Sequence, residues 1–375
     1  MKFRYFLYVI ILVCAAVYVY LNPNVYSKPE SVSSIESFDH HPPSLYESKI
    51  RHLAELKQWL NANQFSQVDD FLSKITLDAL NPWDRKGTLH FYLDYLKSDK
   101  ETFSNKDVHL ATQWVNATGS VYAYSYRSLV NYRLGWQARG TKFFAETPTY
   151  SIHQMRKYFK MAIRDAEHSL TIQSNNGMAW VILIDIKRNV ESKQEVKAIF
   201  HNAIQSAPEY FPIYRTYLSF LQPKWSRYSW EAMFDFAQFY AREKGGYFNA
   251  LITKGHRFKA ATLAGSRSRL PKPIDDRTHD NKAYNKYYRE YFMLDKNWSR
   301  YQKAFELLIA DTPDYVREVY HFTRLAVQTK RKELANQYLN QLVTMGVAAL
   351  ELDELRHIAW LLKKYHYDEF AIVFL

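Results

Sequence analysis

Two clusters of acidic and histidine side chains are the positions in this sequence where a metal could bind. Residues 275–280 hold three aspartates and one histidine, and residues 353–357 read "DELRH" on a predicted helix. A calcium site needs further oxygen ligands at close range, and a zinc helix needs a second histidine that "DELRH" lacks. We therefore interpret the first cluster as a polar loop and the second as a solvated helical face. We predict no metal site.

Motifs for catalysis or cofactor binding are absent from the sequence. It contains no phosphate-binding loop, dinucleotide fingerprint, nucleophile elbow or zinc-protease motif. The single cysteine, Cys14, lies in the N-terminal apolar run, so the rest of the chain has no disulfide and no thiol nucleophile. We predict no catalytic residues and no cofactor.

The segment 254–300 combines positive charge with tyrosine and is the first candidate binding surface. It holds 12 Lys and Arg residues against 5 Asp and Glu residues. The candidates are Arg267, Arg269 and Lys272 in a predicted loop, and Tyr284, Lys286, Tyr287, Tyr288 and Arg289 at helical spacing. One interpretation is a contact surface for an anionic partner, either lipid headgroups or an acidic protein. The other is a solvated loop followed by an amphipathic helix whose tyrosines join the core.

The stretch "SFLQPKWSRYSW", residues 219–230, supplies two more candidates, Lys224 and Trp225. Pro223 has no backbone N–H and ends a helix, while Ser229 can cap the next one. The stretch is therefore interpreted either as a corner with Trp225 packed beneath it or as part of a partner-binding surface.

Helical spacing of apolar residues runs through most of the chain and predicts the elements that position these side chains. Only 10 glycines and 12 prolines occur, which argues against an all-β fold. Helices at 155–172 and 193–208 are each followed by a partner helix, at 177–188 and 209–221. Ala166 and Ala203, one in the first helix of each pair, are 37 residues apart, close to the 34-residue tetratricopeptide unit. We predict an all-α fold, an irregular α-solenoid of tetratricopeptide-like helical hairpins.

Further helices are predicted at 45–60, 229–245, 281–309, 312–329, 331–344 and 348–364. We expect a helical-repeat domain over 45–245 and a C-terminal helical extension over 246–375. The aromatic content of 17% predicts a helix-packed core with many tyrosine hydroxyls near its surface.

The N-terminus predicts a membrane anchor. The uncharged run from Tyr5 to Leu21 is near the short limit for a transmembrane helix, and Lys2 and Arg4 precede it. By the positive-inside rule, residues 1–4 stay in the cytoplasm and the rest crosses the membrane. The alternatives are a cleaved signal peptide and a buried N-terminal helix. Residues 22–44 are interpreted as a polar linker.

Three stretches carry a resemblance to a bacterial family known only as a domain of unknown function. They are "GWQARGTKFF" (135–144), "IFHNAIQSAPEYFPIY" (199–214) and "YLSFLQPKWSRYSWEAMFDFA" (217–237). The resemblance covers about residues 50–245 and implies a helical-repeat fold but no activity. The family usually has glycine after Pro-Lys-Trp, where this chain has Ser226, Arg227 and Tyr228. Because these residues carry side chains, we expect no close approach to the backbone there.

These observations support two hypotheses of function. The first is a scaffold in the bacterial inner membrane, with one pass, that binds a protein or peptide in the periplasm. The second is an enzyme that acts on an envelope polymer with a pair of carboxylates in an aromatic cleft. The net charge of +12 is compatible with acidic partners, but no nucleic-acid-binding module accompanies it, so we expect no nucleic-acid partner.

Overall fold

A computed structural model describes residues 45–74, 88–97, 102–141, 144–189, 192–268, 282–313, 315–345 and 352–367. The chain divides into two compact units, Met1–Ser48 and Lys49–Leu375. Almost all described residues belong to the second unit. Every regular element in that unit that the structure describes is a helix, so the predicted all-α class is confirmed.

The helices of the N-terminal half are α2 (Leu45–Asn61), α3 (Phe65–Ser73), α4 (Thr88–Tyr95), α5 (Asn105–Thr118), α6 (Val121–Arg139), η2 (Phe144–Glu146), α7 (Thr149–Ile172), α8 (Gly177–Lys187), α9 (Lys193–Ser206) and α10 (Phe211–Phe220). Those that follow are α11 (Pro223–Ser226), α12 (Trp230–Lys244), η3 (Gly246–Asn249), α13 (Ala250–Ser268), α14 (Lys282–Met293), α15 (Asp295–Asp311), α16 (Val316–Gln328), α17 (Lys332–Met345) and α18 (Leu352–Lys364).

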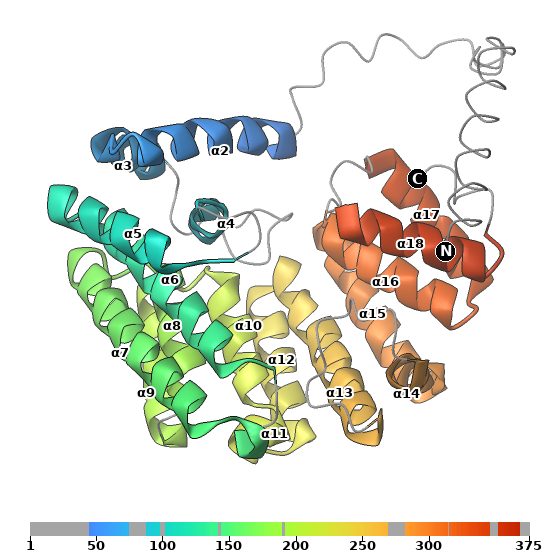
Figure 1. Ribbon diagram of the computed structural model, residues 1–375. Coiled ribbons are helices and arrows are strands. Elements are labelled where there is room, and N and C mark those ends of the chain that lie inside the picture. The colour runs from blue at the N-terminus through green and yellow to red at the C-terminus, as the bar shows by residue number, and fades with distance from the viewer. Residues whose placement is uncertain are drawn as a thin grey trace, which may run out of the picture. The chain divides into compact units, whose positions relative to one another are not determined.

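Contacts between helices join mainly elements that are neighbours or next neighbours in the chain. The pairs α6 and α7, α8 and α10, α13 and α14, and α16 and α17 pack together, and Figure 1 shows α6 beside α7. This nearest-neighbour pattern is that of a helical-repeat solenoid. Contacts of α13 with α10 and α12 cross the domain boundary expected at residue 245.

The predicted repeat in the middle of the chain is present as α7 with α8, followed by α9 with α10. Ala166 in α7 and Ala203 in α9 are both fully buried. Because alanine has only a methyl group, each site lets a neighbouring helix approach closely. Gly177, the first residue of α8, serves the same purpose, since a Cβ there would overlap the buried ring of Tyr210.

Local sequence signals fix several helix ends. The Ser229 side chain accepts a hydrogen bond from the Ala232 N–H at 3.2 Å and caps α12, as predicted. Gly245 ends that helix with φ of +63°, a conformation that favours glycine. Gly140 likewise ends α6, with φ of +69°.

Aromatic side chains form much of the core. Phe200 stacks on Tyr217 with ring centroids 4.1 Å apart, and Phe305 stacks on Phe322 at 4.0 Å. Several tyrosine hydroxyls find polar partners, as when Tyr132 donates to Asp185 at 2.7 Å. The predicted core of packed rings is confirmed, but many tyrosines, such as Tyr126, Tyr210 and Tyr301, are fully buried and do not reach the surface.

Two expectations about the C-terminal half were wrong. The helix predicted over 281–309 is two helices, because the chain breaks at Leu294, which has an extended ψ of 116°. The Asn297 side chain donates to the Tyr291 carbonyl at 2.9 Å and so satisfies one end of the broken helix. Arg267 was expected in a loop but lies in the last turn of α13.

The predicted anchor, from Tyr5 to Leu21, and the linker over 22–44 lie outside the described residues. Within the part of the chain that is described, no helix has the length and apolar character needed to cross a membrane.

Candidate functional site

A cavity of about 520 Å³ lies between α14, α16 and α18, and we call it the basic pocket. Its described lining residues are Lys282, Tyr284, Asn285, Lys286, Tyr288 and Arg289 from α14, Arg324 and Gln328 from α16, and His357, Trp360, Leu361, Lys364 and Tyr365 from α18 and the turn after it. The volume is in the range of sites that hold a small molecule or a few side chains of a partner.

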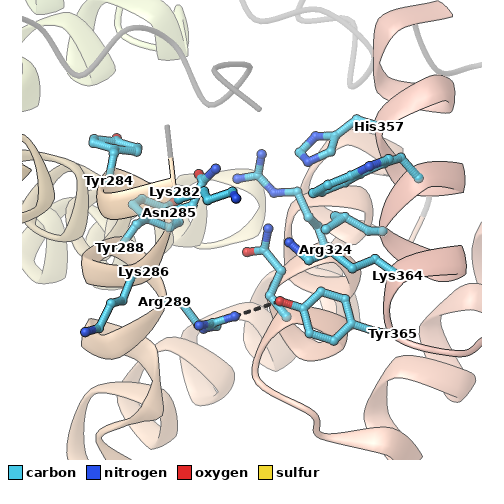
Figure 2. Close-up of a pocket in the computed structure, with 13 residues that line it drawn as sticks. Lys282, Tyr284, Asn285, Lys286, Tyr288, Arg289, Arg324, His357, Lys364 and Tyr365 are labelled. Carbon is cyan, nitrogen blue, oxygen red and sulfur yellow. Dashed lines mark hydrogen bonds between the residues drawn. The ribbon is translucent and has the colours of Figure 1, made fainter. Parts of the chain in front are cut away.

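A hydrogen bond joins α14 to the turn after α18 across the basic pocket. Arg289 reaches from α14 and donates through Nη1 to the Tyr365 hydroxyl at 2.7 Å, as Figure 2 shows. This hydrogen bond holds the Arg289 guanidinium in one orientation at the edge of the cavity. It also connects segments that are 76 residues apart in sequence.

The α18 side of the basic pocket presents an aromatic ring and a cation together. The Lys364 ammonium lies 4.5 Å from the centre of the Trp360 ring and 5.8 Å from that of Tyr365. Trp360 is 45% exposed, which is unusual for so large an apolar side chain. This arrangement offers an aromatic face next to a positive charge.

The basic pocket is strongly positive. Five of its described lining residues are Lys or Arg, and none of those that the structure describes is Asp or Glu. Arg324 is only 3% exposed, so its charge is screened less by water than the charges of the exposed lysines. The arrangement suits an anionic group that also offers apolar surface to the rings.

The structure brings together four of the predicted surface residues, namely Tyr284, Lys286, Tyr288 and Arg289, in the basic pocket. Tyr284 and Tyr288 are also buried, at 3% and 5% exposure, as the alternative interpretation of this helix expected. They form the inner wall of the pocket and are not an exposed surface.

The remaining predicted residues of this segment lie elsewhere. Tyr287 packs beneath Arg267, whose guanidinium carbon is 5.7 Å from the ring centre, and Arg267 also pairs with Glu290 at 3.7 Å. Arg269 and Lys272 lie outside the described residues.

Lys224 and Trp225 belong to a different part of the fold. Trp225 is half-buried in the corner between α10 and α12, and the Arg188 guanidinium lies 4.7 Å from the ring centre. Lys224 is exposed, with its ammonium 5.6 Å from the same ring. Arg227 has φ of +57°, the left-handed conformation that glycine adopts without strain. The corner interpretation of Trp225 thus agrees with its packing.

Neither a family model nor a curated protein matches this chain. Among solved structures, a monomeric mutant of IFIT1 with Gppp-AAAA is similar over 94% of this chain and 70% of that chain, with 10% sequence identity and a TM-score of 0.40.

Sequence reasoning missed the α18 side of the basic pocket. Trp360, Lys364 and Tyr365 come some 70 residues after α14 and are brought to it only by tertiary packing. A local signal for this side was present, because Trp360 and Lys364 are four positions apart on a predicted helix. That spacing places their two side chains next to each other on one helix face.

The described residues contain no group of three or more His, Cys, Asp or Glu side chains that could hold a metal ion. The cluster at 275–280 and the side chains of Asp353 and Glu354 lie outside the described set. His357 is only 5% exposed, so the interpretation of this stretch as a solvated face was wrong for the histidine. The basic pocket has no carboxylate among its described lining residues, so it does not present the carboxylate pair that the enzyme hypothesis requires.

Proposed function

We propose that this chain is a helical-repeat scaffold that binds an acidic segment of a partner protein in the basic pocket. The observation that supports the proposal is the composition of that pocket, which has five cations and no described carboxylate. A carboxylate-rich segment entering it gains charge-assisted hydrogen bonds from Lys and Arg, and its apolar parts contact Trp360 and Tyr365.

Several cations elsewhere in the described helices are held by carboxylates at short distance, whereas Lys286 of the basic pocket lies 3.9 Å from Glu290. Arg127 pairs with Asp165 at 2.8 Å, and Arg133 pairs with Asp94 at 2.9 Å. Such pairs leave little positive potential for a ligand. In the basic pocket, five cations lie beside aromatic rings.

A protein segment suits this site better than a nucleic acid does. Nucleic-acid-binding surfaces usually carry a basic stripe that follows several phosphates. Here the cations surround one cavity of about 520 Å³, which matches a few side chains of a peptide. A nucleic-acid partner is a distinguishable outcome of the binding experiment.

The experiment measures binding of a fluorescent poly-glutamate peptide to the purified full chain by fluorescence anisotropy. The test variant reverses Lys282→Glu and Lys364→Glu in the basic pocket. The matched control reverses two exposed lysines on other helices, Lys160→Glu and Lys303→Glu, with the same change in net charge. We expect affinity to fall at least about tenfold, or 1.4 kcal/mol, in the pocket variant and far less in the control.

Three outcomes contradict the proposal. They are absence of saturable peptide binding, an equal loss in both variants, and displacement of the peptide by a single-stranded oligonucleotide that binds more tightly and depends on the same lysines. An equal loss would mean that only net charge matters. Tighter oligonucleotide binding would mean that the partner is a nucleic acid.

The proposal also includes the location of the scaffold. A transmembrane helix over 5–21 anchors the chain in a bacterial inner membrane, with the helical repeats in the periplasm, on the basis of the Lys2 and Arg4 charges before the apolar run. Alkaline carbonate extraction should leave the full chain in the membrane fraction and release a variant lacking residues 1–21. A phosphatase fused to the C-terminus should be active, and inactivity would reverse the proposed topology.

A further inference from the structure

A second cavity, of about 230 Å³, lies between α8, α10 and α13, and none of its residues belongs to the basic pocket. Its polar lining consists of Asp185, Arg188, Arg215, Thr216, Ser219 and Lys254. Three of these side chains are cations, one is a carboxylate and two are hydroxyls. We call it the α8–α10–α13 cavity.

The single described carboxylate of this cavity is already engaged. Asp185 accepts hydrogen bonds from the Tyr132 hydroxyl at 2.7 Å and pairs with Arg188 Nη2 at 2.8 Å. Its two oxygens are therefore used within the protein, and its charge offsets that of one guanidinium only.

Arg188 is held in one orientation by its surroundings. Besides Asp185, its Nη1 donates to the Ser219 hydroxyl at 3.0 Å, and the Trp225 ring lies 4.7 Å from its guanidinium carbon. The Nε of Arg188 is buried and has no hydrogen-bond acceptor among the described residues. The Arg188 guanidinium is therefore held rigidly at the cavity wall, where its charge favours a bound anion.

Lys254 brings a second buried charge to the wall. It is 8% exposed, and its ammonium is 3.6 Å from Glu318 Oε1. Glu318 is held more closely by others, because Arg257 donates to both of its oxygens at 2.7 and 2.6 Å and Thr253 donates at 2.9 Å. Lys254 and Arg257 thus share Glu318, and Lys254 adds a buried positive charge to the cavity wall.

We infer that the α8–α10–α13 cavity is a binding site for a small oxyanion, and that the group it takes is a phosphate. Arg188, Arg215 and Lys254 supply charge, and Thr216 and Ser219 supply hydroxyls that can hydrogen-bond to phosphate oxygens. Burial strengthens these interactions, because there is little water to screen them. The phosphate is either the free ion or the phosphoryl group of a small metabolite.

The test is isothermal titration of the purified full chain with inorganic phosphate and, separately, with glucose phosphate, in chloride buffers of matched ionic strength. Acetate is the third ligand. We expect saturable binding of at least one phosphate compound and no comparable binding of acetate. The tighter of the two phosphate ligands identifies the source of the group.

Variants locate the site. Lys254→Gln should weaken phosphate binding at least about tenfold, and Lys254→Arg should restore most of it. Lys259→Gln is the control, since Lys259 is on the same helix but lies over the rings of Trp230 and Phe234 and not in the cavity. If Lys254→Gln does not fold, Thr216→Val removes one hydroxyl at nearly constant shape and takes its place.

The inference is overturned if the native protein binds neither phosphate compound, if acetate binds equally well, or if Lys254→Gln and Lys259→Gln have the same effect. The result of this test does not depend on the proposed function, because the α8–α10–α13 cavity and the basic pocket share no lining residue.

Discussion

Arg257 and Glu318 form a doubly hydrogen-bonded ion pair inside the helical core, with both side chains almost fully buried. The pair joins α13 to α16, which are 61 residues apart in sequence. Burial alone would raise the pKa of Glu318, but Arg257 and Lys254, together with hydrogen bonds from Arg257 and Thr253, lower it to about 2. The carboxylate is therefore charged at all ordinary pH values.

Glu318→Gln should be one of the most destabilising single substitutions in the chain. It leaves the Arg257 guanidinium buried without its counter-charge, which costs about 3–5 kcal/mol of unfolding free energy. Urea denaturation followed by circular dichroism measures the loss. Glu243→Gln, which breaks an exposed pair with Arg242, is the control and should change stability by less than about 0.5 kcal/mol. Equal effects of the two would refute the role of the buried pair.

Stability should fall between about pH 6.5 and pH 4 because of His256. Burial, then the charges of Arg300 and Lys259, lower its pKa from 6.5 to about 4. The His256 side chain therefore binds a proton near pH 6.5 in the unfolded chain but only near pH 4 in the folded chain. Because the unfolded state binds more protons in this window, lowering the pH favours unfolding. From about pH 7 to about pH 5 the loss should reach up to about 2 kcal/mol.

Urea unfolding of the native chain and of His256→Gln at both pH values checks this. The substitution also alters the bond of His256 to the Tyr291 hydroxyl, at 2.8 Å, so the informative quantity is the difference between the two pH values. That difference should be smaller in the variant, and an unchanged difference would assign the pH dependence to other groups.

Gly177→Ala should destabilise the protein by about 1–3 kcal/mol, although alanine is the better helix former. The added methyl group would overlap the Tyr210 ring. This ring is 1% exposed, so neighbouring core atoms oppose its movement away from the methyl group. A double-mutant cycle with Tyr210→Ala tests the cause. In that background Gly177→Ala should cost little, and an equal cost in both backgrounds would exclude the overlap as the reason.

Trp225→Ala should lower the free energy of unfolding by about 1–3 kcal/mol, because it removes half-buried ring surface and the contact with Arg188. Trp225→Phe keeps a ring there and should lose less than half as much. Thermal and urea unfolding measure both. If Trp225→Ala is as stable as the native chain but loses binding of the acidic peptide, Trp225 belongs to a partner surface and the corner interpretation fails.

Local rules predicted the helices well where the signal was local. Ser229 and Gly245 marked the ends of α12, and the buried alanines Ala166 and Ala203 marked the repeat. The break at Leu294 was missed because the apolar spacing continues across it, and that spacing does not reveal the local hydrogen bond from Asn297 to the Tyr291 carbonyl.

The candidate site was predictable only on one side. The tyrosines and cations of α14 stood out by composition, but spacing could not decide which tyrosines are buried. Arg289 meets Tyr365 only because α18 returns to α14, and no local pattern encodes a contact over 76 residues. The α8–α10–α13 cavity was missed for the same reason, since Arg188 and Lys254 lie on helices far apart in the sequence.

Photo-crosslinking is the most direct test of the central claim, that the basic pocket binds acidic protein segments. A poly-glutamate peptide with a photoreactive group is irradiated with the purified chain, and the linked residues are identified by mass spectrometry. The account predicts cross-links concentrated on α14 and α18, around Tyr284, Trp360 and Tyr365, that disappear with excess unlabelled peptide. Cross-links spread over the whole basic surface, or concentrated on other helices, would contradict it.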